Sequence, residues 1–264
     1  MHSKKYKNIA VISALNNKTA LAKKLSLIKK YKFVDLDKND TKNIDLIIVL
    51  GGDGMMLHLL HKYEKNPIPL YGINCGTVGF LMNNPDENNL LKIIEETQKS
   101  IIHPLRMTAI SSDNKKHTHI AINEVSLLRQ LSQAAKIDIK INDKTRLSSL
   151  ACDGILVATS AGSTAYNMSL RGPILPLGSK MLALTPISPF RPRNWHGAIL
   201  PANAKIEFEI LDYKTRPVSA TADFIEVRNV KKVSVEEEIS TKFTLLFDSN
   251  HSLEERIIKE QFGG

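Results

Sequence analysis

The sequence is poor in cysteine and contains no long apolar run. Its two cysteines, Cys75 and Cys152, cannot build a disulfide framework, and neither belongs to a C-x-x-C pair. No apolar stretch approaches the length of about 18 residues that a membrane-spanning helix requires, and the first residues lack the apolar segment of a signal peptide. These absences exclude a disulfide-rich secreted domain, and they predict a protein of the reducing cytoplasm that has no membrane partner.

Aromatic residues make up only 6% of the chain, and no basic stretch is interleaved with them. The formal net charge is nevertheless +9, and residues 1–50 contain eleven lysines against four aspartates. Such an excess would attract polyanions or anionic nucleotides, or it would belong to a solvated lysine-rich helix over residues 18–32. We favour the helix, because proteins that bind nucleic-acid strands combine basic grooves with aromatic side chains. No nucleic-acid partner is expected.

Two widespread nucleotide-binding motifs are also missing. Neither G-x-x-x-x-G-K-[ST] nor G-x-G-x-x-G occurs anywhere in the chain, so a P-loop NTPase and an ordinary dinucleotide-binding fold both lack support. The composition, 42% hydrophobic and 24% charged, is typical of a globular protein. A length of 264 residues suits one large domain or two small ones.

Strand and helix patterns alternate through the first hundred residues. Apolar runs at residues 8–13, 45–50 and 69–74 predict buried strands, and residues 18–32, 54–64 and 85–100 have helical patterns. This alternation predicts an α/β domain with an open, Rossmann-like parallel sheet and helices on both faces.

Beyond residue 101, short strand-like runs separated by Gly, Asn, Asp and Pro turns dominate. They cover residues 118–129, 135–143, 153–160, 205–212, 217–227 and 231–238. Residues 241–262 return to a strand pattern followed by a helix pattern. We therefore predict a mainly β domain over residues 101–237, and an α/β domain over residues 1–100 that residues 238–264 complete.

The stretch "IDLIIVLGGDGMMLHLLHKYE" places three glycines and Asp53 at the end of a predicted strand. In an α/β sheet, ligands bind beyond the carboxyl ends of the strands. Glycine permits a positive φ and lets a phosphate approach the backbone closely, and the N-terminus of the following helix favours anions. Gly52 and Gly54 are therefore expected to line an anion site.

Asp53 needs its own explanation, because a carboxylate beside a polyphosphate repels it. It would hold Mg²⁺ that bridges the phosphates, or it would take the proton of an attacking hydroxyl; phosphoryl transfer needs both functions. The structural alternative is an N-cap of the helix that starts at Gly54. His58 would donate a hydrogen bond to a phosphate, or it would simply be exposed to solvent. His58 and His61 are only two histidines, without a third metal ligand, so no metal ligands are assigned.

Two further polar segments lie in the β half. "INEVSLLR" places Asn123 and Glu124 in an apolar strand, where they would bond sugar hydroxyls or occupy a sheet edge. Residues 151–175, "ACDGILVATSAGSTAYNMSLRGPIL", hold a Gly/Ser/Thr-rich turn that would admit a flat ring stacked on Tyr166. The alternative for that turn is a hydroxyl-capped helix. In the first half, "GINCGTVGF", which ends at Phe80, would form a cleft wall or a tight exit from its strand.

In order and approximate spacing, "GGDG", "NE", "DGILVATSAGSTAYNMS" and "LALTPISP" resemble the motifs of the NAD kinase family. GGDG alone is shared with diacylglycerol and sphingosine kinases, whereas the last two segments are much more specific. The resemblance covers residues 50–190. It implies phosphoryl transfer from ATP, or polyphosphate in some members, with Mg²⁺ or another divalent cation, to the 2′-hydroxyl of the adenosine ribose of NAD. It also implies a site shared between subunits of a homo-oligomer, often a tetramer.

The resemblance also implies roles for single residues. Asp53 resembles the catalytic aspartate, Gly52 and Gly54 would approach the phosphates, and Asn123 with Glu124 would bind the dinucleotide near its ribose. The other residues that we expect to bind the nucleotides are His58, Phe80, Asp153, Ala161, Thr164, Ala165, Tyr166, Ser169 and Ser188.

The chain departs from the family pattern at several positions. Met55 follows GGDG where threonine or asparagine is frequent, Ala161 replaces a proline or serine, Arg171 replaces a usual glycine, and Phe224 follows Asp223 where glycine is common. Arg171 bears on local geometry more than on the class of activity. Two other functions remain open: a lipid or sugar kinase of the GGDG type, and a catalytically silent nucleotide-binding regulator.

Overall fold

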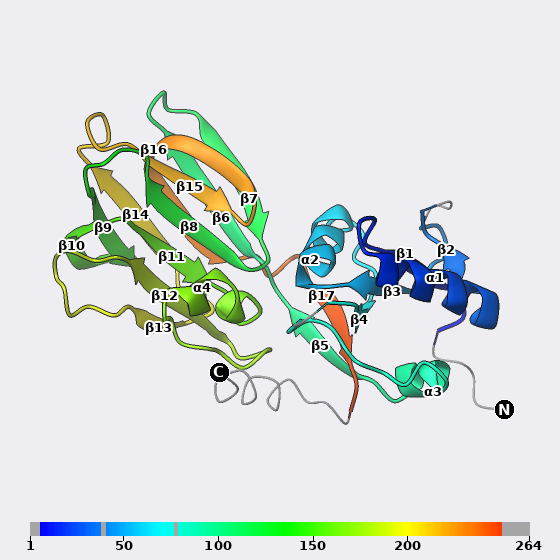
Figure 1. Ribbon diagram of the computed structural model, residues 1–264. Helices are drawn as coiled ribbons and strands as arrows, with labels where there is room; N and C mark the ends of the chain where they lie inside the picture. Colours follow the sequence, from blue (N-terminus) through cyan, green and yellow to red (C-terminus); the bar gives the residue numbers. More distant parts are fainter. Residues whose placement is uncertain (1–5, 38–40, 77–78, 250–264) are drawn as a thin grey trace. The chain divides into compact units, whose positions relative to one another are not determined.

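The computed structural model describes residues 6–37, 41–76 and 79–249. It divides the chain into two compact units, which we name the α/β unit and the β unit (Figure 1). The α/β unit comprises residues 1–102 and 241–264, and the β unit comprises residues 103–240. The chain therefore leaves the α/β unit once and returns to it once.

A six-stranded sheet runs through the α/β unit in the order β2-β1-β3-β4-β17-β5. Its strands are β1 (Ile9–Ser13), β2 (Val34–Asp35), β3 (Leu46–Gly51), β4 (Leu70–Asn74), β5 (Gln98–Ile102) and β17 (Phe243–Phe247). Neighbouring strands are parallel from β2 to β17, whereas β5 is antiparallel to β17. The predicted open sheet and the return of the tail to it are confirmed. The helix predicted after β17 lies outside the described residues.

Helices lie on both faces of this sheet. α1 (Lys18–Tyr31) and α3 (Leu90–Glu95) pack on the face that carries Val11, Ile48 and Tyr71. α2 (Asp53–Lys62) packs on the opposite face, where a Cβ placed on Gly72 would lie 2.7 Å from Cε of Met56. Every residue of β1 and β3 is buried, as expected for parallel strands that are covered on both sides.

The helix predicted over residues 85–100 is shorter than expected. Oδ1 of Asp86 accepts the amide of Asn88 at 3.0 Å in a turn, and α3 begins only at Leu90. It ends at Glu95, because residues 98–102 pair with β17 as β5. The prediction was wrong for residues 98–100, where pairing with a strand far away in the sequence overrides the local helical pattern.

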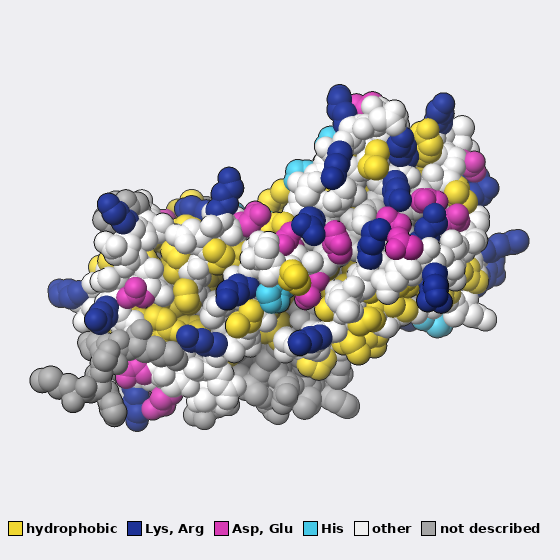
Figure 2. Space-filling model, turned by 180° about the vertical axis from the view of Figure 1, so that it is seen from behind, with side chains coloured by type: hydrophobic (Ala, Val, Ile, Leu, Met, Phe, Trp, Pro, Cys, Tyr) yellow, Lys and Arg dark blue, Asp and Glu magenta, His cyan; other side chains and the backbone are white. Residues whose placement is uncertain are grey.

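The lysine-rich helix α1 forms as predicted, and Asn17 caps it by accepting the amide of Ala20 at 3.0 Å. One of its lysines is not solvated, however. Lys24 is 4% exposed, and its Nζ lies 2.5 Å from Oδ1 of Asp35 and also pairs with Asp37. On the face shown in Figure 2, lysine and arginine side chains are spread singly among acidic ones. On that face the positive charge is dispersed rather than gathered in one patch.

The β unit is built from antiparallel strand pairs in a sheet of order β10-β9-β14-β16-β15-β8-β11-β12-β13, with β6 paired to β16 and β7. Its strands are β6 (Leu105–Ser111), β7 (Lys116–Ala121), β8 (Glu124–Arg129), β9 (Ala135–Ile141), β10 (Lys144–Cys152), β11 (Gly154–Ala158), β12 (Met181–Ile187), β13 (Ala198–Pro201), β14 (Ile206–Leu211), β15 (Val218–Ala222) and β16 (Ile225–Glu237). The 3₁₀-helix η1 (Gly162–Thr164) and the short helix α4 (Tyr166–Ser169) follow β11. The predicted mainly β architecture is confirmed.

The predicted strands over residues 118–129 and 217–227 are each interrupted. The first breaks at Ile122 and Asn123, between β7 and β8. The second turns back at Asp223 and Phe224, because Ala222 pairs with Ile225 in a two-residue hairpin. Alternate residues of these strands face a core that includes Val125, Leu127 and Phe208. No helix among the described residues is long and apolar enough to cross a membrane.

Candidate active site

The GGDG turn joins β3 to α2 at the carboxyl end of a central parallel strand. Gly52 is the N-cap residue, without a side chain that could cap the helix, and Asp53 is the first helical residue. The interpretation of Asp53 as the N-cap is therefore wrong. An acidic residue in the first turn still interacts favourably with the helix dipole.

The Asp53 carboxylate binds backbone amides of a different segment. Its Oδ2 accepts the amide of Phe80 at 2.8 Å, and its Oδ1 accepts the amide of Leu81 at 2.9 Å. Gly79 lies beside the carboxylate, since a Cβ placed there would be 3.3 Å from Oδ1. The segment after β4 therefore orients Asp53. Phe80, which we expected at the site, contributes its backbone amide.

Space, and not backbone conformation, explains the two glycines that flank Asp53. Gly52 has φ −127° and ψ −172°, which any residue can adopt, and Gly54 is a helical residue without a positive φ. Of the two properties of glycine considered for this turn, the positive φ is not used at either position. A Cβ placed on Gly52 or Gly54 would meet no described atom within 4 Å. The backbone at both positions is thus open to close approach by a phosphate.

Other residues of α2 have different surroundings. Met55 packs beside the turn, since a Cβ on Gly51 would lie 3.1 Å from its Cβ. His58 is exposed and His61 half-buried. Both alternatives for His58 therefore stay open, because an exposed imidazole near the helix start would also reach a bound anion.

In the β unit, one carboxylate organises the turn that holds Asn123 and Glu124. Oδ2 of Asp223 accepts the amide of Ile122 at 2.7 Å, and its Oδ1 accepts those of Asn123 and Glu124 at 3.0 and 3.1 Å. The pair thus lies at an irregular strand end between β7 and β8. Asp223 was not identified as a functional candidate, because Phe224 follows it in place of the glycine that marks a two-residue hairpin.

Glu124 lies in an environment that disfavours its charge. Burial, and then the negative charge of Asp223, raise the pKa of Glu124 to about 7. Its Oε2 is buried and has no hydrogen-bond partner among the described residues. Burial also raises the pKa of Tyr166, and the charges of Glu124 and Asp153 raise it further. The structure therefore brings Glu124, Asp153 and Tyr166 into one electrostatic neighbourhood.

Several polar residues of the 159–175 segment hold the segment itself together. Oγ1 of Thr159 donates to the carbonyl of Ile122 at 2.7 Å. Nδ2 of Asn167 donates to the carbonyls of Ser163 and Pro173 at 3.0 and 2.9 Å, so Asn167 is fully buried. The predicted hydroxyl-capped helix is nevertheless wrong, because neither η1 nor α4 has a side-chain cap.

The predicted ligand-binding residues of the same segment have other positions. Thr164, Ala165 and Tyr166 are half-buried and Ser169 is exposed, whereas Ala161 is only 6% exposed. Because its side chain is buried, Ala161 can contribute to ligand binding only through its backbone or through packing. Gly162 seats the segment on the 122–124 turn, since a Cβ there would lie 2.1 Å from the carbonyl oxygen of Asn123.

Asp153 and Ser188 lie at neighbouring strand ends. The Asp153 amide donates to the carbonyl of Ile187 at 3.0 Å, which places Ser188 next to it, exposed and with φ 45°. Oδ1 of Asp153 accepts from Nε of Arg129 at 2.6 Å. Arg129 was not identified from the sequence. It forms an ion pair with Asp153, while Asp223 is the acid that raises the pKa of Glu124.

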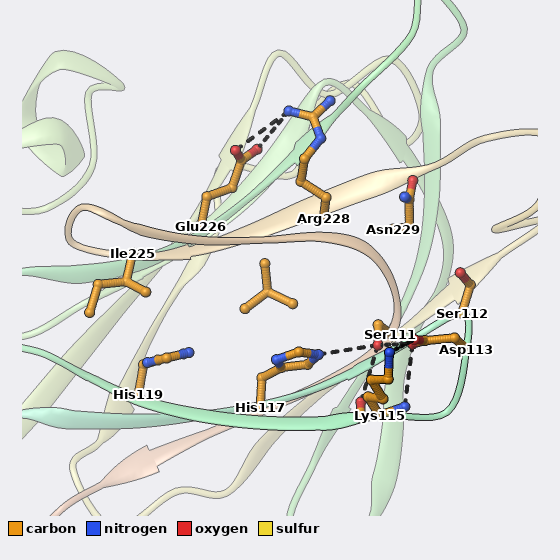
Figure 3. A pocket seen from close by; sticks show the side chains of 11 residues that line it. Ser111, Ser112, Asp113, Lys115, His117, His119, Ile225, Glu226, Arg228 and Asn229 are labelled. Carbon is orange, nitrogen blue, oxygen red and sulfur yellow. Dashed lines mark hydrogen bonds and ion pairs between the residues drawn. The ribbon is translucent and has the colours of Figure 1, made fainter.

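A separate groove of about 650 Å³ lies between β7 and the start of β16 (Figure 3). His117 and His119 project into it from β7, opposite Ile225. Both histidines are half-buried. None of the predicted site residues lines this groove. Its charged groups form two pairs, Lys115 with Asp113 at 2.8 Å and Arg228 with Glu226 at 3.3 Å, so it offers no excess charge to a ligand.

Within the described ranges, no three His, Cys, Asp or Glu side chains cluster in a way that would hold a metal ion. Mg²⁺ keeps several waters and binds one or two carboxylates together with substrate phosphates. A single carboxylate, Asp53, beside the open backbone of Gly52 and Gly54 fits a cation that arrives with a nucleotide.

Comparison with known proteins agrees with this arrangement. Residues 3–100 match the family described as the ATP-NAD kinase N-terminal domain, and residues 122–235 match the ATP-NAD kinase C-terminal domain. The chain is 53% identical to an NAD kinase of Rickettsia bellii over 225 residues, which cover 85% of this chain and 88% of that protein. It is 52% identical to an NAD kinase of Caulobacter vibrioides over 221 residues, or 84% and 85% of the two chains.

Two solved structures share the fold. Yeast NADH kinase in complex with NADH superposes with a TM-score of 0.79 at 22% identity, covering 98% of this chain and 88% of the other. An NAD kinase from Archaeoglobus fulgidus in complex with ATP gives a TM-score of 0.76 at 22% identity, covering 96% and 98%. With both family domains matched and about half of the residues identical to those of its relatives over most of their length, this chain belongs to the NAD kinase family.

Proposed function

We propose that this protein transfers the terminal phosphoryl group of ATP to the 2′-hydroxyl of the adenosine ribose of NAD, which yields NADP and ADP. The observation that carries the proposal is the 53% identity to a protein named NAD kinase over 88% of that protein's length. In the reaction, a bond forms between the ribose oxygen and the γ-phosphorus, and the bond from that phosphorus to ADP breaks. The hydroxyl proton must pass to a base.

Asp53 is the candidate for that base, or for the carboxylate that positions the metal. Two amide donors hold its oxygens at 2.8 and 2.9 Å, and an ionised carboxylate has about four lone-pair sites. A carboxylate held in this orientation can take a hydroxyl proton or bind a cation. A positioned base contributes on the order of 10²–10⁴-fold in rate. Mg²⁺ bound with ATP would neutralise phosphate charge and would be held by Asp53.

In the β unit, we assign dinucleotide binding to the residues around Glu124. Asn123 and Glu124 would bond ribose hydroxyls, and Tyr166 offers a half-buried ring on which a base would stack. Asp153, Thr164, Ala165, Ser169 and Ser188 complete the proposed binding set. In the α/β unit, Gly52, Gly54, His58 and the backbone of Phe80 are assigned to the phosphates.

Further parts of the proposal concern partners and location. Family membership supports a homo-oligomer, and the molar mass from light scattering would show whether it is a tetramer. Family membership also supports polyphosphate as a second phosphoryl donor, which an activity assay would test. Two free cysteines in the described residues suit a reducing cytoplasm. We also propose that the α/β part, residues 1–100 with 238–264, and the β part, residues 101–237, are the two folding domains.

The test incubates purified protein with Mg-ATP and NAD and detects NADP with an NADP-specific dehydrogenase. Parallel reactions replace NAD by NADH, by diacylglycerol or by a hexose, and replace ATP by polyphosphate. NADP should form from NAD. Phosphorylation of the lipid or sugar alone would support the other kinase hypothesis, and folded protein that binds NAD without any turnover would support the silent regulator.

A further inference from the structure

We propose that Asp223 is a positioning residue for dinucleotide binding, which fixes the turn of residues 122–124 and so orients Asn123 and Glu124. The inference rests on the proposed function, because it assigns this turn to NAD. Asp223 would not itself touch the substrate. It would act through three backbone amides and through the charge that it places beside Glu124.

The hydrogen bonds of Asp223 supply the geometric argument. The chain leaves β7 at Ala121 and enters β8 at Glu124, so the intervening amides have no strand partner of their own. Buried backbone amides require acceptors, and the two oxygens of Asp223 accept three consecutive ones at 2.7, 3.0 and 3.1 Å. The Asp223 amide donates in return to the carbonyl of Glu124 at 3.1 Å. Four hydrogen bonds thus join the hairpin tip to the turn.

The backbone of Asp223 is adapted to this arrangement. The residue lies in the left-handed region at φ 52°, in the two-residue turn between β15 and β16. Aspartate and asparagine enter that region more readily than most residues. Substitution by asparagine should therefore keep the turn and remove the negative charge together with one acceptor.

The side chains that Asp223 orients are those left available for a ligand. In the described part of the chain the Asn123 side chain makes no hydrogen bond, while its carbonyl accepts the amide of Thr159 at 2.9 Å. Oε2 of Glu124 is buried without a partner. A turn with a fixed backbone and free side-chain polar groups is suited to bonding the hydroxyls of a sugar.

After burial, Asp223 is the second influence on the charge state of Glu124. The charged or titratable groups that face Glu124 are Asp223 from the β15–β16 turn and Tyr166 from α4. Burial and the charge of Asp223 both raise the pKa of Glu124. Removing the charge of Asp223 should therefore lower the pKa of Glu124. A substitution that disturbed only the packing would not lower that pKa.

The test compares Asp223→Asn with Asp143→Asn. Asp143 is a matched control, because it lies at φ 61° in the two-residue turn between β9 and β10, and its carboxylate bonds the Lys205 ammonium at 3.1 Å. Asp223→Asn should raise KM for NAD about tenfold, the loss expected for one charge-assisted hydrogen bond, with kcat changed less. Asp143→Asn should leave both constants unchanged.

Two further readouts separate positioning from general stability. The pH at which KM for NAD changes should fall in Asp223→Asn, and Glu124→Gln should abolish that change in a chain that retains Asp223. Amide hydrogen exchange at residues 122–124 should accelerate in Asp223→Asn, whether or not the protein turns over.

The outcomes are distinguishable. A KM within twofold of the wild type, an unshifted pH midpoint, or unchanged exchange at residues 122–124 would overturn the role of Asp223. If the wild-type protein forms no NADP, the proposed function fails. The affinity for NAD, measured by calorimetry for the wild type, Asp223→Asn and Asp143→Asn, then decides the positioning role. If Asp223→Asn does not fold, amide exchange in the wild-type protein decides it: amides of residues 122–124 that exchange as fast as those of an exposed turn would contradict the inference.

Discussion

A Cβ placed on Gly52 or Gly54 would meet no described atom within 4 Å, whereas one on Gly162 would lie 2.1 Å from the carbonyl oxygen of Asn123. At Gly52 and Gly54, glycine leaves the backbone open toward solvent or a ligand. At Gly162, glycine lets two segments of the protein pack against each other. The same residue type in two sequence motifs therefore has two different physical explanations, and mutations can separate them.

The largest effect is expected from Asp53→Asn, at the open turn. Loss of a positioned base should reduce kcat by about 10²–10⁴-fold, with NAD affinity nearly unchanged. Steady-state kinetics and calorimetry measure the two quantities. Asp45→Asn is the matched control, since Asp45 also accepts two backbone amides, those of Lys7 and Asn8, both at 3.0 Å. Equal losses of kcat in both variants would show that Asp53 serves only to hold the backbone.

The packed glycine should be far less tolerant than the open ones. Gly162→Ala forces the turn at Asn123 to move, which should lower the free energy of unfolding by about 3 kcal/mol. Urea denaturation followed by circular dichroism measures it. A Gly162→Ala protein as stable as the wild type would show that the two segments are not in tight contact.

At the open turn, Gly52→Ala should affect binding and not stability. Its φ and ψ suit alanine, so the free energy of unfolding should change by less than about 0.5 kcal/mol. The new methyl group would occupy the space assigned to a phosphate, and KM for ATP should rise about tenfold, equivalent to about 1.4 kcal/mol. An unchanged KM for ATP would place the phosphates elsewhere.

Glu124 should make NAD binding depend on pH. Its pKa is raised to about 7, and bound NAD would raise it further by excluding water and adding phosphate charge. Binding then takes up a proton, so KM for NAD should rise about fivefold as pH increases from about 6 to about 8. Glu124→Gln should give a flat profile over this range. A KM that falls with rising pH would contradict this sign.

The smallest effect concerns Arg171, at φ 61° where the family resemblance implied glycine. Replacing a side chain in the left-handed region by glycine relieves about 1 kcal/mol of backbone strain, part of which the greater entropy of the unfolded chain offsets. Arg171→Gly should therefore raise stability by about 0.5 kcal/mol without changing KM for NAD. Thermal unfolding measures the gain. A large change in KM would instead give Arg171 a part in ligand binding.

Much of the architecture follows from local patterns. The continuous apolar runs at β1 and β3 are buried strands, and the alternating runs of the second half are antiparallel strands. Predictions were wrong where distant pairing decides the structure, as at residues 98–100, which form part of β5 through its pairing with β17.

The candidate site, too, could be predicted from the sequence only in part. The sequence singled out Asp53 and the Asn123–Glu124 pair as polar residues in apolar surroundings. It did not reveal what holds them, because Asp53 bonds amides 27 and 28 residues away and Asp223 bonds amides about 100 residues away. Arg129 beside Asp153 is another such long-range partner. Residue type predicts candidates, whereas their hydrogen-bond partners depend on the tertiary fold.

The position of β17 has a consequence for synthesis on the ribosome. β17 lies between β4 and β5 in the sheet, yet it is translated after the whole β unit. A nascent chain that ends before residue 243 therefore has β4 paired only with β3, and β5 without its partner. The β unit can collapse as soon as its last strand emerges, while the α/β unit must wait for β17, which is translated after that strand. The part of the protein translated first is thus the part that finishes folding last.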